Sequence, residues 1–409
     1  MNTVSVVVPT LGRPSLAEML RALGPLPAGM ELIVVDDRAD VRTPLALPTE
    51  STARVVAGRR AGPAAARNAG WRAARHEWVA FLDDDVLPES GWAWRLLGDL
   101  RDAGPEVGGV QGRIRVPLPD GRRPTDWERV TAGLASGEWI TADMAYRRAA
   151  LSRVGGFDER LPRAFREDAE LAHRIRRAGW RLRIGQRSTT HPVRPETRWI
   201  SLRVQRGNAD DALLRRMYGP QWRTSLGIPP GRRHRHALIT AGLATAAACT
   251  VAHLLTARRN PAVTPGTGSR GKVAAPGTGH GKSGVAPGTG RRRWSVAAAL
   301  AAAGWAAGTA EFAAARIMPG PRDRREVTTM VLTSVAIPPV AIAHWVRGWF
   351  RWRGAEPLPE TSPAPTRVTA PSSAVGLPGS AGTSAPRDPD PDGGDARIPD
   401  GGRIAGARR

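Results

Sequence analysis

Short apolar runs alternate with helical patterns from residue 4 to about residue 220. Four of these runs have the length and composition of buried strands: 4–8, 32–35, 54–57 and 78–82. Helical patterns over 14–23 and 62–75 separate them. Strands that alternate with helices are typical of an α/β domain with a largely parallel sheet. The pattern therefore predicts one such domain over residues 1–225.

Polar residues follow three of the predicted strands. Thr10 ends the first strand, Asp36-Asp37 ends the second, and Asp83-Asp84-Asp85 ends the fourth. Ligands of open α/β sheets bind outside the carboxyl ends of the strands, so we expect these side chains to converge on one crevice. Adjacent carboxylates repel each other, whereas Mg²⁺ or Mn²⁺ accepts their oxygens and keeps positions open for phosphate. The triplet indicates a metal-bound nucleotide, with a solvated acidic turn as the alternative.

Three apolar segments follow the α/β domain, at 236–257 and, within 294–350, at 294–310 and 327–345. Each is flanked by arginines, and each is a candidate for a membrane-spanning helix. The first two are rich in alanine, the second is expected to stop near Glu311, and the third contains Pro338-Pro339. Soluble or interfacial helices are the alternative interpretation.

The membrane topology is not simple. Three spans that start from a cytoplasmic domain would export the basic segment 258–293, against the positive-inside tendency. A hairpin or surface-lying helices would avoid this conflict. The same segment is rich in Gly and Pro and repeats Pro-Gly-Thr-Gly from Pro265, Pro276 and Pro287, so we expect a disordered linker. The tail at 354–409 is expected to be disordered as well.

Composition and charge narrow the class of protein. The formal net charge is +23, from 60 basic and 37 acidic residues, and the only lysines are Lys272 and Lys282. Such a chain attracts phosphates and anionic lipid. It has neither zinc-finger spacing nor an aromatic-rich basic platform, so we expect no nucleic-acid partner. The single cysteine, Cys249, excludes an intrachain disulfide. The first residues contain no secretory signal pattern, so the first domain is expected to be cytoplasmic, at the inner face of the cell membrane.

Several motifs occur together in one order: Val-Val-Val-Pro-Thr at 6–10, Val-Val-Asp-Asp at 34–37, Gly-Pro-Ala-Ala-Ala-Arg-Asn-Ala-Gly at 62–70, Phe-Leu-Asp-Asp-Asp at 81–85, Gly-Gly-Phe-Asp-Glu at 155–159 and Glu-Asp at 167–168. In this combination the chain resembles the family 2 glycosyltransferases over about residues 3–220. The resemblance implies a GT-A fold, which is a Rossmann-like nucleotide-diphospho-sugar transferase domain. It also implies a nucleotide-diphosphate sugar donor, Mg²⁺ or Mn²⁺, and inversion at the anomeric carbon.

The resemblance also implies roles for individual residues. Those placed around the donor are Thr10, Asp36 and Asp37 at the base and ribose, Arg67 and Asn68 beside the sugar nucleotide, and Arg203 and Arg206 closing over the diphosphate. Asp85 is expected to bind the metal, Asp83 to contact ribose or metal, and Asp84 to lie between them near the nucleotide. His191 is a further candidate metal ligand, with a structural role as its alternative. An ordinary surface arginine is the alternative for Arg67, and a solvated basic helix face for Arg203 and Arg206.

Asp168 matches the catalytic base of the family. Inversion by direct displacement needs a base for the proton of the acceptor hydroxyl, and a carboxylate at the start of a helix can be aimed there. A helix N-terminus lowers the basicity of a carboxylate, so burial has to compensate. A helix charge shared with Glu167 and Glu170 is the alternative. Asp143 stands where many relatives have Asn, and we expect this change to alter acceptor or sugar contacts.

The sequence therefore predicts transfer of a single sugar to a hydroxyl acceptor on a lipid-linked or cell-envelope glycan. Processive relatives carry Gln-x-x-Arg-Trp, whereas here Arg198-Trp199 is preceded by Pro195 in place of Gln. A sugar nucleotidyltransferase is one alternative, although the segment 11–14 is a slight match to its glycine-rich signature. A non-catalytic membrane-tethered scaffold is the other, and the presence of Asp83, Asp85 and Asp168 argues against it.

Overall fold

The computed structural model describes residues 3–259 and 289–359, which belong to one unit, residues 1–364. Most of the expected linker and nearly all of the predicted tail lie outside the described residues, but Thr289-Gly290, the end of the third PGTG repeat, already belongs to a helix. The strands are β1 (Val4–Thr10), β2 (Met30–Asp36), β3 (Arg54–Ala57), β4 (Trp78–Leu82), β5 (Leu87–Pro88), β6 (Val107–Arg115), β7 (Asp143–Arg147) and β8 (Arg181–Thr190). The first α-helices are α1 (Ser15–Leu23), α2 (Pro63–Ala73), α3 (Trp92–Arg101), α4 (Asp126–Ala132), α5 (Arg148–Val154) and α6 (Glu167–Arg177).

The remaining helices follow β8. They are α7 (Ile200–Arg203), α8 (Asn208–Tyr218), α9 (Trp222–Ser225), α10 (Arg233–Arg259), α11 (Thr289–Ile317) and α12 (Arg324–Arg351). Two 3₁₀ turns, η1 (Gly133–Ser136) and η2 (Val204–Gly207), complete the described elements. The four predicted strands and the two predicted helices of the first domain are all present, with boundaries shifted by a few residues.

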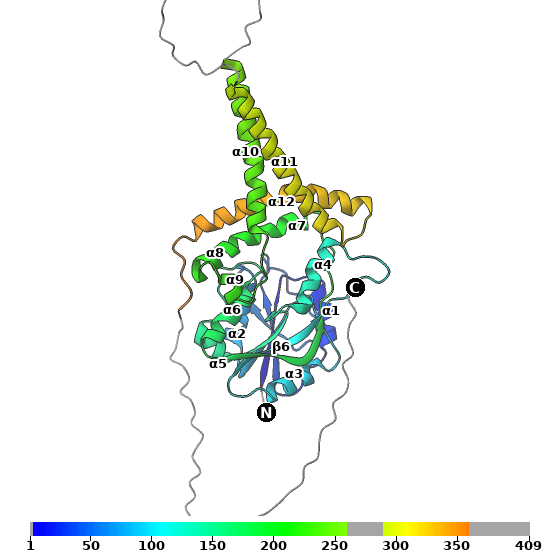
Figure 1. Ribbon diagram of the computed structural model, residues 1–409. Helices are drawn as coiled ribbons and strands as arrows, with labels where there is room; N and C mark the ends of the chain where they lie inside the picture. The colour runs from blue at the N-terminus through cyan, green and yellow to red at the C-terminus, as the bar shows by residue number, and fades with distance from the viewer. Residues whose placement is uncertain (1–2, 260–288, 360–409) are drawn as a thin grey trace, which may run out of the picture. The chain divides into compact units, whose positions relative to one another are not determined.

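The strands form one sheet in the order β3-β2-β1-β4-β7-β6-β8-β5, with helices on both of its faces (Figure 1). The half that holds β1 to β4 is parallel, as expected. The other half is mixed, because β7 runs antiparallel to both β4 and β6. The expected α/β fold is confirmed, with a sheet less uniformly parallel than the pattern predicted.

The apolar strands are continuous because both faces of the sheet are covered. Val6 and Val8 face a core made with α1 and α3. Val7 and Ile33 face a second core made with α2, α5 and α6. Since successive side chains of a strand point to opposite faces, an alternating polar residue in β1 must be buried, and Ser5 is, with its hydroxyl donating to Glu31 of β2 at 2.7 Å. The acidic clusters follow where β2 and β4 end.

Gly62 and Pro63 fix the start of α2. Gly62 has φ +93°, a conformation that disfavours side chains, and an added Cβ would lie 2.3 Å from the carbonyl oxygen of Pro162. Pro63 occupies the first helical position, where its missing N–H costs nothing. The backbone can thus approach the 162 segment closely, and α2 turns Arg67 and Asn68 toward the interior, where both are buried.

The three apolar segments are helices, and each is long and apolar enough to cross a membrane by length and composition. The expected stop near Glu311 is wrong: α11 continues to Ile317, and Glu311 lies within the helix, where it forms ion pairs with Arg232 and Arg235. Likewise, α12 continues through Pro338-Pro339. Helices α10 and α11 lie side by side (Figure 1).

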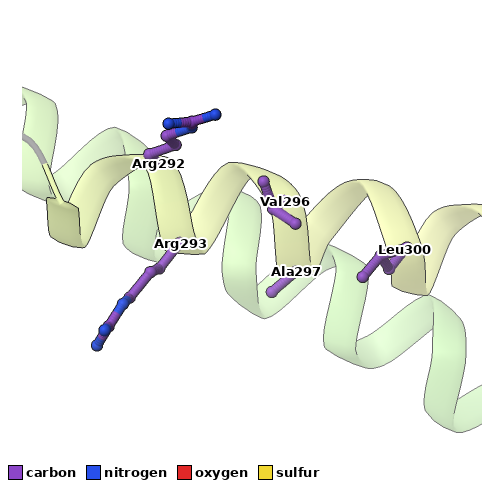
Figure 2. Close-up of a pocket in the computed structure, with 5 residues that line it drawn as sticks. All are labelled: Arg292, Arg293, Val296, Ala297 and Leu300. Carbon is purple, nitrogen blue, oxygen red and sulfur yellow. The ribbon is translucent and has the colours of Figure 1, made fainter.

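A hollow on α11 is lined by Val296, Ala297 and Leu300 beside Arg292 and Arg293 (Figure 2). Its lining contains no carboxylate and no nucleophile. It therefore has no chemistry in common with the acidic strand ends.

Candidate active site

The three aspartates after β4 have different partners. Asp84 is 2% exposed; its Oδ2 accepts a hydrogen bond from the hydroxyl of Thr10 at 2.7 Å, and its Oδ1 pairs with Arg13 at 2.8 Å. The Thr10 hydroxyl also accepts from the backbone N–H of Gly12 at 2.9 Å. Asp84 therefore ties the end of β4 to the end of β1. The expectation that Thr10 and Asp84 contact the nucleotide is not favoured, because both side chains are engaged inside the protein.

Asp85 faces a histidine and an arginine from the segment after β8. Its Oδ1 lies 3.8 Å from Nε2 of His191, and its Oδ2 lies 2.9 Å from Nε of Arg194. Burial and the nearby Asp83 raise the pKa of the Asp85 carboxyl, so a positive charge at this position would be favourable. The chain folds so that two predicted metal ligands, far apart in the sequence, meet.

These residues fit a divalent cation that also binds phosphate. No group of three or more His, Cys, Asp or Glu side chains arranged to hold a metal occurs among residues 3–259 and 289–359. Mg²⁺ is commonly bound through one or two carboxylates, with phosphate and water completing the shell. Asp85, with His191 beside it and Asp83 two positions earlier, offers such a partial set.

Arg67 connects the aspartate cluster to α6. It is 2% exposed, and its guanidinium donates to Asp83 Oδ1 at 2.7 Å and to Glu167 Oε1 at 2.8 Å. The surface-arginine alternative is therefore wrong. A direct phosphate clamp is not favoured either, because both terminal nitrogens already hold carboxylates. Arg67 instead fixes the distance between the strand-end acids and the acids of α6.

Asn68 is used internally as well. Its amide nitrogen donates to the Phe157 carbonyl and to Glu159, and its oxygen accepts from the Phe157 N–H at 2.9 Å and from the Trp71 indole at 2.8 Å. The side chain is 1% exposed. The expected contact between Asn68 and the sugar nucleotide is therefore corrected: Asn68 fastens α2 to the Gly-Gly-Phe-Asp-Glu segment.

Asp168 lies in the first turn of α6, where its Oδ1 accepts from the N–H of Ala169 at 2.8 Å. Burial raises the pKa of Asp168 above its ordinary value, and this effect exceeds the lowering by the helix backbone and by Arg67. Burial therefore raises the pKa of Asp168 by more than the helix N-terminus lowers it, as a general base at this position requires. Burial and the charge of Asp168 also raise the pKa of Glu167 to about 8.

The second acidic strand end lies next to the first. Thr10 is paired in register with Asp36, and the N–H of Asp37 donates to the Thr10 carbonyl at 2.9 Å. The Asp36 carboxylate binds Arg38, which lowers the pKa of Asp36. Asp37 accepts from the N–H of Arg60 at 2.6 Å. The three predicted strand ends thus meet along one edge of the sheet.

Some predicted residues lie elsewhere or have other roles. Arg203 and Arg206 are exposed on α7 and η2, and Arg203 pairs with Glu196 at 2.5 Å. Asp143 is 0% exposed and binds Arg187, Trp92 and Thr189. The expectation that Asp143 alters acceptor or sugar contacts is wrong, because it is sealed inside the core.

Sequence reasoning missed three arginines: Arg13, Arg187 and Arg194. Their partners, Asp84, Asp99 with Asp143, and Asp85, lie far from them in sequence. In a chain this rich in arginine, no local signal distinguishes Arg13 or Arg187. Arg194 has a weak one, since it follows the candidate ligand His191 by three positions.

Comparison with known protein families identifies the part of the chain that carries this site. Residues 5–154 match the family model described as Glycosyl transferase family 2. This segment is a family 2 glycosyltransferase domain. Residues 126–206 also match the model of Glycosyl transferase family 21. The mixed sheet with helices on both faces is thus the GT-A fold that the resemblance implied.

The glycosyltransferase domain has curated relatives in two strains of Mycobacterium tuberculosis, CDC 1551 / Oshkosh and H37Rv. Each is a Pre-mycofactocin glycosyltransferase, 34% identical over 231 residues, which cover 50% of this chain and 46% of the relative. The chain therefore spans about half the length of the curated relatives it matches.

Two solved structures are also similar. Glucosyl-3-phosphoglycerate synthase from M. tuberculosis, in complex with Mn²⁺, uridine diphosphate and phosphoglyceric acid, has 22% identity and a TM-score of 0.38, covering 56% of this chain and 80% of the other. S. aureus TarS 1–349 in complex with UDP-GlcNAc has 18% identity and a TM-score of 0.35, covering 55% and 70%.

Proposed function

We propose that this chain transfers one sugar from a nucleotide-diphosphate sugar to a hydroxyl acceptor, with Mg²⁺ or Mn²⁺ and with inversion at the anomeric carbon. The pairing of Asp85 with His191, at the carboxyl end of β4 in a glycosyltransferase domain, carries the proposal. A buried carboxylate with a raised pKa, next to an imidazole, a partly exposed arginine and a second aspartate, suits a cation that binds phosphate.

Asp85 and His191 would hold the cation, with Asp83 contacting it directly or through water. When bound, the cation supplies charge neutralisation for the departing nucleotide diphosphate. Arg194 lies beside Asp85, and its side chain is 39% exposed, so its remaining N–H groups can bind phosphate oxygens. Asp36 and Asp37 line the neighbouring strand end, where carboxylates can accept from ribose hydroxyls and base N–H groups.

Asp168 would remove the proton from the acceptor hydroxyl while that oxygen attacks the sugar. Its raised pKa suits a general base, because proton transfer is most efficient when the pKa of the base lies near the working pH. Arg67 keeps Glu167, the neighbour of Asp168, at a fixed distance from Asp83. Arg67 therefore acts as a positioning residue between the donor side and the acceptor side of the site.

The proposed acceptor is a lipid-linked or cell-envelope glycan, and the proposed location is the inner face of the cell membrane. Three helices that are long and apolar enough to cross a membrane follow the glycosyltransferase domain and support both proposals. Such helices would keep the site near acceptors that are themselves held in the bilayer.

The test is transfer or donor hydrolysis across a panel of nucleotide-diphosphate sugars, with Mn²⁺ or Mg²⁺, with EDTA, and after the metal is restored. We expect turnover with at least one donor, loss in EDTA, recovery on adding metal, and a loss of about 10²-fold or more for Asp85→Asn. Asp120→Asn, at an exposed loop position, is the matched control.

Full activity of Asp85→Asn, or equal turnover in EDTA, would overturn the metal role. Release of pyrophosphate from a nucleoside triphosphate and a sugar phosphate would instead identify a sugar nucleotidyltransferase. Absence of turnover and of binding with every donor would contradict the enzymatic proposal as a whole.

A further inference from the structure

Helix α12 differs from the two other apolar helices in how it is covered. In its apolar stretch 39% of the positions are buried, against 11% in α10 and 17% in α11. The buried positions of α12 are Thr329, Met330, Thr333, Ser334, Ile337, Pro338, Ala341 and Gly348. Several are polar, and Arg316 of α11 donates to the hydroxyls of Thr333 and Ser334 at 2.8 and 3.1 Å. One side of α12 is therefore a protein interior rather than a lipid-facing surface.

Both ends of α12 are tied to the glycosyltransferase part of the chain. Near its N-terminus, Glu326 accepts a hydrogen bond from the N–H of Asp126 in α4 at 2.9 Å. Near its C-terminus, an added Cβ on Gly348 would lie 2.6 Å from the carbonyl oxygen of Ala209 in α8. Arg216 of α8 also donates to the Trp349 carbonyl at 3.2 Å. A helix held at both ends by one domain does not carry one of those ends across a hydrocarbon layer about 30 Å thick.

The opposite side of α12 is apolar and exposed. Its exposed large side chains are Val331, Leu332, Val335, Val346 and Phe350, between 39% and 61% exposed. At about 100° per residue they fall within an arc of about 100°, which is one continuous stripe along the helix. We name these five residues the outer stripe. The buried positions named above lie on the other side of the helix.

Arginines stand at both ends of α12, and the N-terminal pair lies in line with the outer stripe. Arg324 and Arg325 occupy the first turn of α12, and Arg347 and Arg351 lie near its end; all four are exposed. A helix with an apolar face rimmed by arginines binds at the boundary between headgroups and acyl chains, where guanidinium groups contact lipid phosphates. A purely protein partner would not require basic residues at both ends of such a helix.

The chain leaves the glycosyltransferase domain at the start of α10 and returns to it at the end of α11, and both points lie on one side of the domain. The start of α10 is fastened to α11 by the pairing of Arg235 with Glu311 at 3.0 Å. The end of α11 is fastened to α4, since Arg316 pairs with Asp126 at 2.8 Å and Arg129 donates to the Arg316 carbonyl. The start of α12, separated from the end of α11 by six residues, is therefore on the same side as the start of α10.

From these observations we infer that α12 is a membrane-surface helix: its outer stripe lies in the plane of an anionic lipid bilayer, and only α10 and α11 enter the hydrocarbon. This inference rests on the membrane association proposed above. It replaces three candidate spans with a two-helix hairpin and one helix that lies flat between the domain and the lipid. The site is thereby held against the membrane surface by two contacts rather than by a single flexible tether.

The test measures the depth of spin labels along α12. The full-length chain with Cys249→Ala is reconstituted in vesicles of phosphatidylcholine and phosphatidylglycerol. Single labels are attached through Val331→Cys, Val335→Cys, Val346→Cys or Phe350→Cys, and collisions with oxygen and with a water-soluble nickel complex give their depth. Leu300→Cys on α11 serves as the deep control, and Asp120→Cys in an exposed loop as the aqueous control.

We expect all four α12 labels at one shallow depth, between the two controls, and shallower still in vesicles without phosphatidylglycerol. A transmembrane α12 of 28 residues, about 42 Å long, would instead give a depth gradient with its two ends on opposite sides. That result overturns the inference. Labels as accessible to nickel as the aqueous control, or shielded from both reagents by a protein partner, overturn it as well.

The outcome is distinguishable from failure of the proposed enzymatic function, because label depth does not depend on turnover. If the Leu300→Cys control is also aqueous, membrane association itself is contradicted. If that control is deep while the α12 labels are aqueous, only the surface role of α12 fails.

Discussion

Two buried clusters of acids around an arginine lie within the glycosyltransferase region, and they differ in how completely their polar atoms are satisfied. In the first, Arg187 is 0% exposed and donates to Asp143 at 2.7 Å, to Asp99 at 3.0 Å and to the Val110 carbonyl at 2.7 Å. We refer to it as the closed cluster. It connects α3, β6, β7 and β8, and further donors, Trp92 and Thr189, complete the shell of Asp143.

In the second cluster, Arg67 bridges Asp83 and Glu167, but the shell is incomplete. Glu167 Oε2 and Arg67 Nε have no hydrogen-bond partner within the described part of the chain. The Asp83 side chain is 26% exposed. We refer to it as the open cluster. Buried polar atoms without partners cost free energy, so an incomplete shell indicates a site kept for a ligand, whereas a complete one indicates a role in stability.

The largest effect is expected on turnover, at the base beside the open cluster. Asp168→Asn keeps the shape of the side chain but removes its basicity, so kcat should fall by about 10² to 10⁴-fold. The free energy of unfolding should change little. Steady-state kinetics and thermal unfolding check both, with Asp120→Asn as control. A variant that keeps more than a third of wild-type kcat would assign the base elsewhere, with Glu167 the next candidate.

The next effect is expected on stability, in the closed cluster. Arg187→Met removes the guanidinium that bridges Asp99 and Asp143 and leaves buried charge unpaired, so the free energy of unfolding should fall by about 3–5 kcal/mol. Arg181→Met, at an exposed position of the same strand, is the control. Chemical denaturation measures the difference. Equal stability of the two variants would show that the closed cluster contributes little.

Arg67→Met tests whether the open cluster is less important for stability than the closed one. The unfolding free energy should fall by about 1–3 kcal/mol, because Asp83 reaches solvent and Glu167 already favours its protonated form. The value of kcat/KM should fall by about 10-fold or more, since Asp83 loses its fixed position. Arg72→Met, half-exposed on the same helix, is the control. A stability loss equal to that of Arg187→Met would remove the distinction between the clusters.

The smallest effect concerns pH. With the pKa of Glu167 raised to about 8, ionisation of Glu167 adds a second negative charge beside the Asp168 carboxylate and strengthens this base, so kcat/KM should rise through about pH 8. Glu167→Gln cannot acquire this charge, so the rise near pH 8 should be lost. The free energy of unfolding should change with pH in the opposite direction. The native state retains a proton that the unfolded state releases near 4.5, so wild-type stability should fall between about pH 4.5 and 8.

Glu167→Gln should remove most of this pH dependence of stability, which thermal unfolding at several pH values would show. A rise of kcat/KM near pH 8 that persists in the variant would contradict the coupling between Glu167 and Asp168. The pH-rate profile of Glu170→Gln is not a suitable control, because Glu170 is buried with Arg174. Glu106→Gln, at an exposed position far along the chain, serves instead.

Local patterns were sufficient to predict the strands and the acidic strand ends. The run from Trp78 to Leu82 is continuous because both faces of the sheet are covered, and the first polar residues mark where cover ends. Parallel neighbours then place Thr10 beside Asp36 by register alone. Asp85, His191 and Asp168 could be singled out because a known motif order accompanies them.

The side-chain partners of the buried polar residues could not be predicted from the sequence. The sequence gives no means of telling that Arg67 binds Asp83 and Glu167, that Arg187 binds Asp143, or that Asn68 fastens two segments. These contacts join residues up to 100 positions apart. Their strength depends on burial and on competing donors, which are properties of the assembled fold.

The sequence by itself determined the α/β domain, the acidic strand ends and three helices apolar enough for a membrane, because each follows from periodicity or from adjacent residues. Only the tertiary structure decided which acids are open to a ligand and which are sealed. It also decided that one side of α12 is covered and the other bare. Burial removes water from a side chain only when distant segments pack over it, and no local pattern specifies that packing.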